Sequence, residues 1–239
     1  GLRNLPQPRS TLAGLLWPDH PEDLARTNLR HVLRQLRQSL PTDPNEPPLL
    51  LTSQQTIQLN PDRPYLLDVT RFTELIAQAE QCDHRQLEAC PACVACYSEA
   101  ATRYRGEFLA GLAVQDSDLF ENWVMGQREA LHRQALEIFF LLAAYHEGAH
   151  NFDQARHFAW RQIELEPWRE EAHRQLMRLL ARSGQRTAAL AQFAQCRATL
   201  AEELGVEPDP ETLALYEQIR AGELGRESEY ATEPATGKT

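Results

Sequence analysis

The segment EDLARTNLRHVLRQLRQSL, residues 22–40, carries two stripes of side chains at helical spacing. The first stripe consists of Arg26, Arg30, Arg34 and Arg37. The second consists of Leu29, Leu33, Leu36 and Leu40. At about 100° per residue the stripes lie roughly a quarter-turn apart on one α-helix. The sequence therefore predicts a helix over residues 22–40 whose leucines pack in a core and whose arginines run beside it.

The flanking segments predict a second helix before this one and a β-hairpin after it. Residues 10–16, STLAGLL, form a short helical pattern that ends before two helix-breaking prolines, Pro18 and Pro21. Residues 48–60, PLLLTSQQTIQLN, alternate apolar and polar side chains on both sides of a polar SQQ, which is typical of a hairpin. The predicted order is helix, turn, arginine-bearing helix, hairpin.

From residue 65 onward the pattern is helical. Helices are predicted at 67–81, 96–106, 127–147, 152–165, 169–183, 186–204 and 210–221, with a loop over 113–123. Ala155 and Ala189 lie 34 residues apart at equivalent points of two helical hairpins, which matches the tetratricopeptide period. Two ordinary α-hairpins remain the alternative.

Charge is unevenly distributed along the 239 residues. Residues 1–64 hold seven arginines and six acids, whereas residues 65–239 hold 17 basic residues and 28 acids. The overall acidity argues against general coating of nucleic acid but is compatible with one local basic element. No apolar run is long enough to span a membrane and no signal peptide is visible, so a soluble cytoplasmic protein is expected.

Several motifs together resemble a known family. LAGLLWPDHPEDLARTNLRHVLRQLRQSL, LDVTRF, YRGEFLAGL, IELEPWREEAHRQLMRLLARSGQRTAALAQF and LAEELGVEPDPETLALYEQI are similar to those of SARP/AfsR-type bacterial transcriptional regulators. The resemblance implies an OmpR-type winged helix-turn-helix that binds DNA, followed by an all-α, tetratricopeptide-like bacterial transcriptional activation domain. The expected fold is mainly α, with residues 1–64 as a partial winged helix, 65–221 as the activation domain and 222–239 as a flexible tail.

The resemblance also sets expectations about function. The segment preceding residue 10 is too short for the sheet and first helix of an OmpR-type domain, so we expect a fragment of a DNA-binding activator. Arg26, Arg30, Arg34 and Arg37 are expected to contact double-stranded promoter DNA. The helical domain is expected to contact the transcription machinery or another protein, with no membrane partner, and a homodimer stays open. The alternative is a helical-repeat scaffold that no longer binds DNA.

Cysteines cluster in QCDHRQLEACPACVAC, residues 81–96. Cys82, His84, Cys90 and Cys93 could together form a tetrahedral structural zinc site, the one cofactor that the sequence suggests. Free thiols packed as apolar side chains, or a disulfide, are the alternatives.

The remaining residues do not indicate a catalytic site. No nucleophile stands in a strand–turn–helix context and the acids and histidines are scattered, so we do not expect an enzyme. Trp123 and Trp168 are expected to pack between helices in the core.

Overall fold

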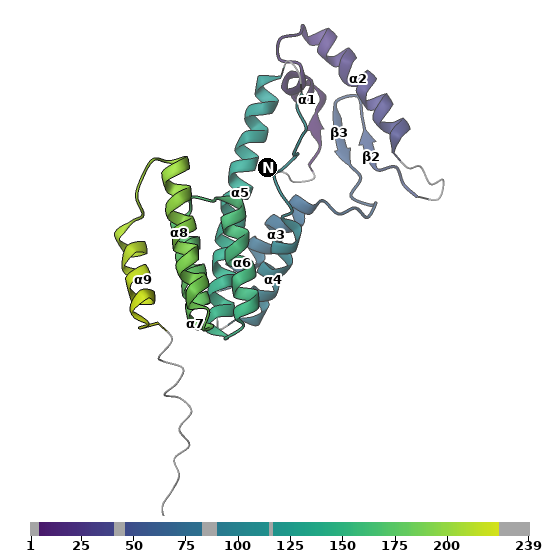
Figure 1. Cartoon of the computed structure of the whole chain (residues 1–239). Coiled ribbons are helices and arrows are strands. Elements are labelled where there is room, and N and C mark those ends of the chain that lie inside the picture. Colours follow the sequence, from purple (N-terminus) through teal and green to yellow (C-terminus); the bar gives the residue numbers. More distant parts are fainter. Residues whose placement is uncertain (1–4, 41–45, 83–89, 115–116, 225–239) are drawn as a thin grey trace, which may run out of the picture. The chain divides into compact units, whose positions relative to one another are not determined.

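The computed structural model describes residues 5–40, 46–82, 90–114 and 117–224 (Figure 1). Its elements in chain order are β1 (Gln7–Pro8), α1 (Arg9–Leu16), α2 (Glu22–Ser39), β2 (Leu50–Thr52), β3 (Thr56–Leu59), α3 (Asp68–Glu80), α4 (Pro91–Arg103), α5 (Asp118–Gly148), α6 (Phe152–Leu165), α7 (Glu170–Arg182), α8 (Arg186–Glu203) and α9 (Pro210–Ala221). The described part of the chain is thus mainly α-helical with one small sheet, which confirms the predicted fold class.

Packing divides the chain into two compact units. Unit 1 comprises Gly1–Ile76 and Thr102–Arg133, and unit 2 comprises Ala77–Ala101 and Gln134–Thr239. The helices α3, α4 and α5 each contribute residues to both units. The sequence placed a domain boundary at residues 64–65 instead, and that boundary stays a prediction.

The core of unit 1 lies where α1 and α2 meet the hairpin. Its buried members are Ala13, Ala25, Leu29, Leu33 and Ile57. Trp17 packs against them at the end of α1, where its N–H donates to the Ala13 carbonyl over 2.9 Å. Pro21 precedes α2 and has no N–H to leave unpaired, so the second helix begins directly after the turn.

The hairpin belongs to a three-stranded antiparallel sheet in the order β1-β3-β2 (Figure 1). In the hairpin, Leu50 pairs with Leu59 and Thr52 with Ile57. The sequence pattern did not predict β1, in which Gln7 pairs with Ile57 and Pro8 with Thr56. A strand of two residues has no period to detect, and only its pairing with β3 defines it.

The helix α5 begins nine residues earlier than predicted. Ser117 is buried and caps it: its carbonyl accepts from the Glu121 N–H over 3.0 Å, and its hydroxyl accepts from the Phe120 N–H over 3.3 Å. The same hydroxyl donates to the Leu15 carbonyl, which ties the start of α5 to α1 within unit 1. The predicted loop over residues 113–123 was therefore wrong from Asp118 onward.

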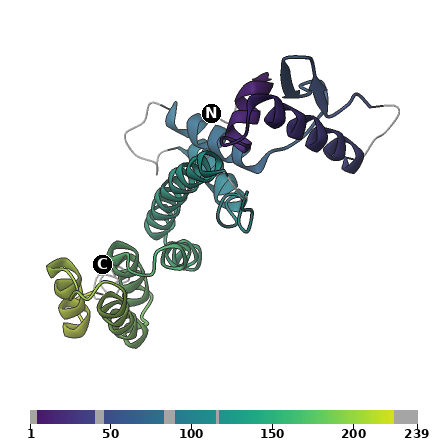
Figure 2. The same ribbon diagram turned by 90° about the horizontal axis from the view of Figure 1, so that it is seen from above.

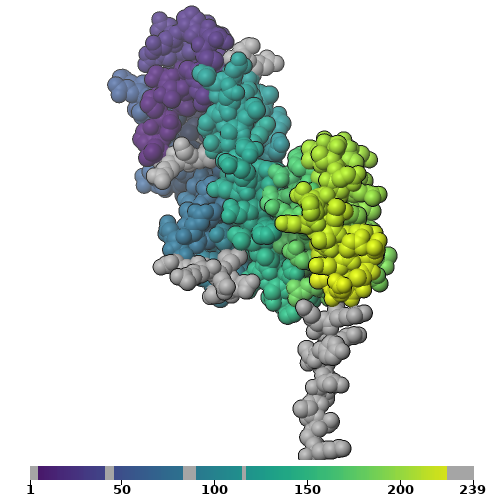
Figure 3. Space-filling model, turned by 90° about the vertical axis from the view of Figure 1, so that its left-hand side faces the viewer, coloured from purple at the N-terminus to yellow at the C-terminus, as the bar shows by residue number. Residues whose placement is uncertain are grey.

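In unit 2, helices α6 to α9 pack side by side in chain order (Figure 2). Ala155 and Ala189 are each the fourth residue of their helix, α6 and α8, and both are completely buried. A side chain this small lets neighbouring helices approach closely, which supports the repeat read from the sequence. The larger core side chains include Ile163, Leu176, Met177, Leu179, Phe193 and Ile219. The α9 surface lies against α8 (Figure 3).

Both tryptophans predicted for the core are more exposed than expected. The Trp123 ring contacts the rings of Phe108 and Phe120, with centroids 5.8 and 5.7 Å away, yet 37% of the residue is exposed. Trp168 is 43% exposed in the turn before α7. Among the described residues, no helix has the length and apolarity that a bilayer crossing requires.

Candidate nucleic-acid interface

Helix α2 has one buried side, formed by Ala25, Leu29 and Leu33, which are 3%, 4% and 8% exposed. These residues follow one another at intervals of four and pack against α1 and the hairpin. Their burial fixes the rotation of α2 about its axis. It thereby determines which side chains face solvent.

The four arginines predicted to contact DNA are all exposed along α2. We call Arg26, Arg30, Arg34 and Arg37 the arginine face. In the described part of the chain only Arg26 pairs with a carboxylate, that of Glu22 one turn earlier, over 3.2 Å. No acidic residue occurs between residues 24 and 40, so the positive charge of the other three is not neutralised within the helix.

Arg30 and Arg34 contact side chains other than carboxylates. Arg30 donates to the hydroxyl of Thr27 over 2.7 Å, and Arg34 lies 3.4 Å from Nδ1 of His31. Contacts of this kind orient a guanidinium without an acid that neutralises its charge. These side chains can therefore bind phosphate oxygens, or guanine O6 and N7, with little competition.

The hairpin is attached to the same helix. Arg37 donates to the hydroxyl of Thr52 on β2. At the tip of the hairpin, the Ser53 hydroxyl accepts from the N–H groups of Gln55 and Thr56 over 3.1 and 2.9 Å, which closes the turn. The helix and the hairpin thus form one connected surface.

Leu36 does not face the core as predicted. It is 41% exposed, although the helical period places it between Ala25 and Leu29 on the buried side of α2. The reason is its position along the helix: α2 has 18 residues and α1 only eight, and the buried part of α2 ends at Leu33. Leu40, the last member of the predicted stripe, is half-buried.

Arg9, which the sequence pattern did not single out, lies beside the arginine face. An open cavity of ≈ 420 Å³ is lined by Arg9, Asp23, Arg26, Thr27, Arg30 and Gln54. The Nε of Arg9 is buried and has no hydrogen-bond partner among the described residues. Its backbone N–H donates to the Gln55 carbonyl at the hairpin tip over 2.8 Å. Arg9 lies beside α2 only because the chain folds in this way. The helical periodicity of the sequence therefore could not identify Arg9 as part of this surface.

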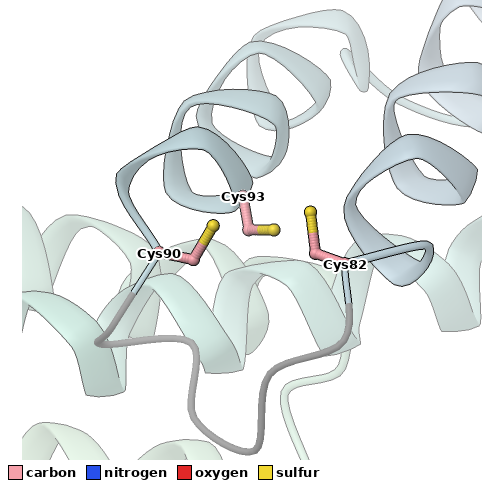
Figure 4. A group of neighbouring side chains, drawn as sticks. All are labelled: Cys82, Cys90 and Cys93. Carbon is pink, nitrogen blue, oxygen red and sulfur yellow. The ribbon is translucent and has the colours of Figure 1, made fainter.

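The second group of predicted site residues lies in unit 2. The sulfur atoms of Cys82, Cys90 and Cys93 all lie within 4.8 Å of one another (Figure 4). His84, the fourth predicted zinc ligand, lies outside the described residues. The structure therefore brings three of the four proposed ligands together.

The three thiols differ in their surroundings. Cys82 is exposed, Cys90 is half-buried and Cys93 is buried. Burial raises the pKa of Cys93 to about 12, and the neighbouring thiols of Cys82 and Cys90 add to this effect. The pKa of Cys90 is lowered because hydrogen bonds from the Cys93 backbone and thiol stabilise its thiolate. The cluster thus contains one thiol whose pKa is lowered and one whose pKa is raised.

Comparisons with known proteins give one family model and a similar fold. The family model described as "bacterial transcriptional activator domain" matches residues 67–220. Among solved structures, Mycobacterium tuberculosis EmbR in complex with a low-affinity phosphopeptide has a similar fold, with a TM-score of 0.57 and 22% sequence identity. The similarity covers 92% of this chain and 56% of the EmbR chain, so the chain spans little more than half of that protein. The comparison with curated proteins gives no match.

Proposed function

Because this chain belongs to the bacterial transcriptional activator domain family, we propose that it acts in transcription by binding double-stranded promoter DNA through α2 and the hairpin. The arginine face carries the proposal: three of its four arginines have no acidic partner in the described part of the chain. In this proposal α2 enters the major groove and the hairpin contacts the flanking backbone. Such a protein works in the cytoplasm and needs no catalytic residues.

The charge distribution supports one local DNA contact. Residues 1–64 carry a net charge of +1, from seven arginines and six acids, whereas the whole chain carries −10. An acidic protein is repelled by phosphates over most of its surface. Binding is then confined to the segment where arginines gather, and that segment sets the orientation on DNA.

Arg9 supplies a second element of this proposal. Its buried Nε lacks a partner among the described residues, and the cavity beside it is open to Arg26 and Arg30. A DNA phosphate at this cavity would accept charge-assisted hydrogen bonds from three guanidinium groups. Asp23, on the wall of the cavity, weakens the site and keeps it from binding anions indiscriminately.

The helical unit is proposed to make the protein contacts of the activator. Its repeat of packed hairpins presents extended surfaces, which is how such arrays bind partners. The transcription machinery, or another regulator, is the class of partner that the family implies.

The experiment is a titration of the natural protein against labelled promoter fragments and a scrambled duplex. We expect the promoter fragment to bind more tightly, and Arg9→Gln and Arg34→Ala to weaken that binding. Arg133→Ala is the control, because Arg133 is also an exposed arginine but lies on α5 beside Glu129. If neither duplex binds, the helical-repeat scaffold becomes the better account, and partner capture by unit 2 would be the function to test.

A further inference from the structure

Three thiols gather where the end of α3 meets the start of α4 (Figure 4). Cys82 follows the last turn of α3, and its N–H donates to the Ala79 carbonyl over 3.2 Å. Cys90 directly precedes α4, and its carbonyl accepts from the N–H groups of Cys93 and Val94 over 3.1 and 3.2 Å. Cys93 lies in the first turn of α4. The end of α3 and the start of α4 therefore bring three thiol groups, which are soft metal ligands, close together.

We propose that Cys82, Cys90 and Cys93 bind one zinc ion as thiolates. A tetrahedral ion with Zn–S bonds of about 2.3 Å needs sulfur atoms about 3.8 Å apart. The sulfur atoms here all lie within 4.8 Å of one another. Side-chain rotations that move each sulfur atom by roughly 1 Å would therefore bring the three to the spacing that zinc needs. The proposal concerns unit 2 alone and does not depend on DNA binding.

The start of α4 suits an anionic cluster. Helix N-termini stabilise thiolates, and the Cys90–Cys93 spacing is that of a CxxC pair. Each thiol loses its proton when its sulfur binds the metal. If all three thiols are protonated beforehand, binding of one zinc ion releases three protons. The thiol of Cys93 gives up its 3.4 Å hydrogen bond to the Ala79 carbonyl, and the metal–sulfur bond replaces it.

Packing as apolar side chains does not account for the trio. Cys196 shows that behaviour: it is buried among the helices of unit 2, away from the cluster. Cys82 is exposed and Cys90 half-buried, so hydrophobic burial gives no reason for their sulfur atoms to gather around Cys93. A disulfide joins only two of the three and leaves the third unexplained.

The consequence of binding is structural. Three thiolates fill three positions of the ion, and a ligand from outside the trio fills the fourth. Zinc held in this way fixes the end of α3 against the start of α4. The two helix ends then resist separation as long as the metal is bound.

The test uses the full chain, purified under reducing conditions, loaded with zinc and freed of excess metal. We expect about one bound zinc per chain by elemental analysis. Cys82→Ser, Cys90→Ser and Cys93→Ser should each lose the ion. Cys96→Ser is the matched control, because Cys96 is on α4 but outside the cluster, and it should retain the ion.

Cobalt supplies a second readout, since a thiolate-to-cobalt charge-transfer band reports sulfur ligation directly. The band should appear in the parent and in Cys96→Ser and fall in Cys82→Ser, whose exposed position makes misfolding an inadequate explanation. A parent chain without bound zinc overturns the proposal, whether five free thiols or a disulfide is found instead. Equal zinc loss in Cys96→Ser would overturn the assignment of ligands.

Discussion

At the scale of the residue, the leucines of α2 differ although their spacing makes them look alike. Leu29 and Leu33 are 4% and 8% exposed, whereas Leu36 is 41% exposed. The difference arises because the buried part of α2 ends at Leu33, whereas Leu36 lies on the same side but nearer the end of the helix. A leucine beyond the end of the core gains little from the fold.

Leu33→Ala and Leu36→Ala should therefore have unequal effects on stability. Removing the buried Leu33 side chain leaves a cavity and should lower the free energy of unfolding by about 2–5 kcal/mol. Leu36→Ala should change it by about 0.5 kcal/mol, as for an exposed position. Urea unfolding followed by circular dichroism measures both, and equal losses would show that Leu36 is packed in the core as Leu33 is.

The sequence predicted the arginine face correctly as an exposed surface, since charged side chains beside a leucine stripe are rarely buried. It assigned Leu36 wrongly because periodicity gives the direction of a side chain but not how far along the helix the covering surface extends. Arg9 was beyond such reasoning, because its place beside Arg26 and Arg30 depends on the hairpin.

At the scale of the element, α7 contains a buried histidine with both ring nitrogens in use. His173 Nε2 lies 2.8 Å from the Pro167 carbonyl, and Nδ1 lies 2.7 Å from Nε2 of Gln192 on α8. A neutral ring that donates from Nε2 and accepts at Nδ1 satisfies both contacts. Burial lowers the pKa of His173, although the hydrogen bond to Pro167 and the charge of Glu170 oppose that shift.

The stability of the protein should therefore fall as the pH drops below about 6.5. The unfolded chain takes up a proton on this residue near the ordinary histidine pKa of 6.5, while folded His173 resists until lower pH. Burial lowers the pKa of His146 as well, so it contributes in the same direction. Thermal unfolding at several pH values should show a flatter dependence for His173→Gln than for the parent. Identical slopes would mean that His173 takes up its proton in the folded protein as easily as in the unfolded chain.

Element boundaries show what local sequence can and cannot predict. The bounds of α6 to α9 agreed within a residue, because strong periodicity is broken by prolines and glycines between these helices. The left-handed Gly184, with φ of 76°, is one such break after α7. The predicted start of α5 was wrong: Ser117 caps the helix at Phe120 and also donates to the Leu15 carbonyl of α1, a contact that local sequence does not show.

At the scale of the whole molecule, the acidic charge and the arginine face lie on different segments. The chain carries −10 overall, yet α2 has no acid after its first turn. This separation could be predicted from the sequence, because the charged residues of each segment can be counted without knowing the fold. The way that residues 102–133 pack with residues 1–76 could not, because those contacts join segments far apart in the chain.

A core substitution in unit 2 should leave DNA binding intact while lowering stability. Leu176 is completely buried in α7, so Leu176→Ala should cost about 2–5 kcal/mol in the free energy of unfolding. The affinity for promoter DNA, measured well below the melting temperature, should equal that of the parent. A large loss of affinity in a folded variant would show that unit 2 contributes to the DNA contact.

The salt dependence of DNA binding tests the central claim most directly. Each arginine that binds a phosphate releases counterions, so Arg30→Ala or Arg34→Ala should flatten the plot of log affinity against log salt by about one unit. An arginine that reads a base should instead cost about 1–3 kcal/mol on the promoter site and relax the preference over scrambled DNA. Arg133→Ala should match the parent on both duplexes. If all four variants of the arginine face also match the parent in affinity and slope, α2 is not the DNA-binding element.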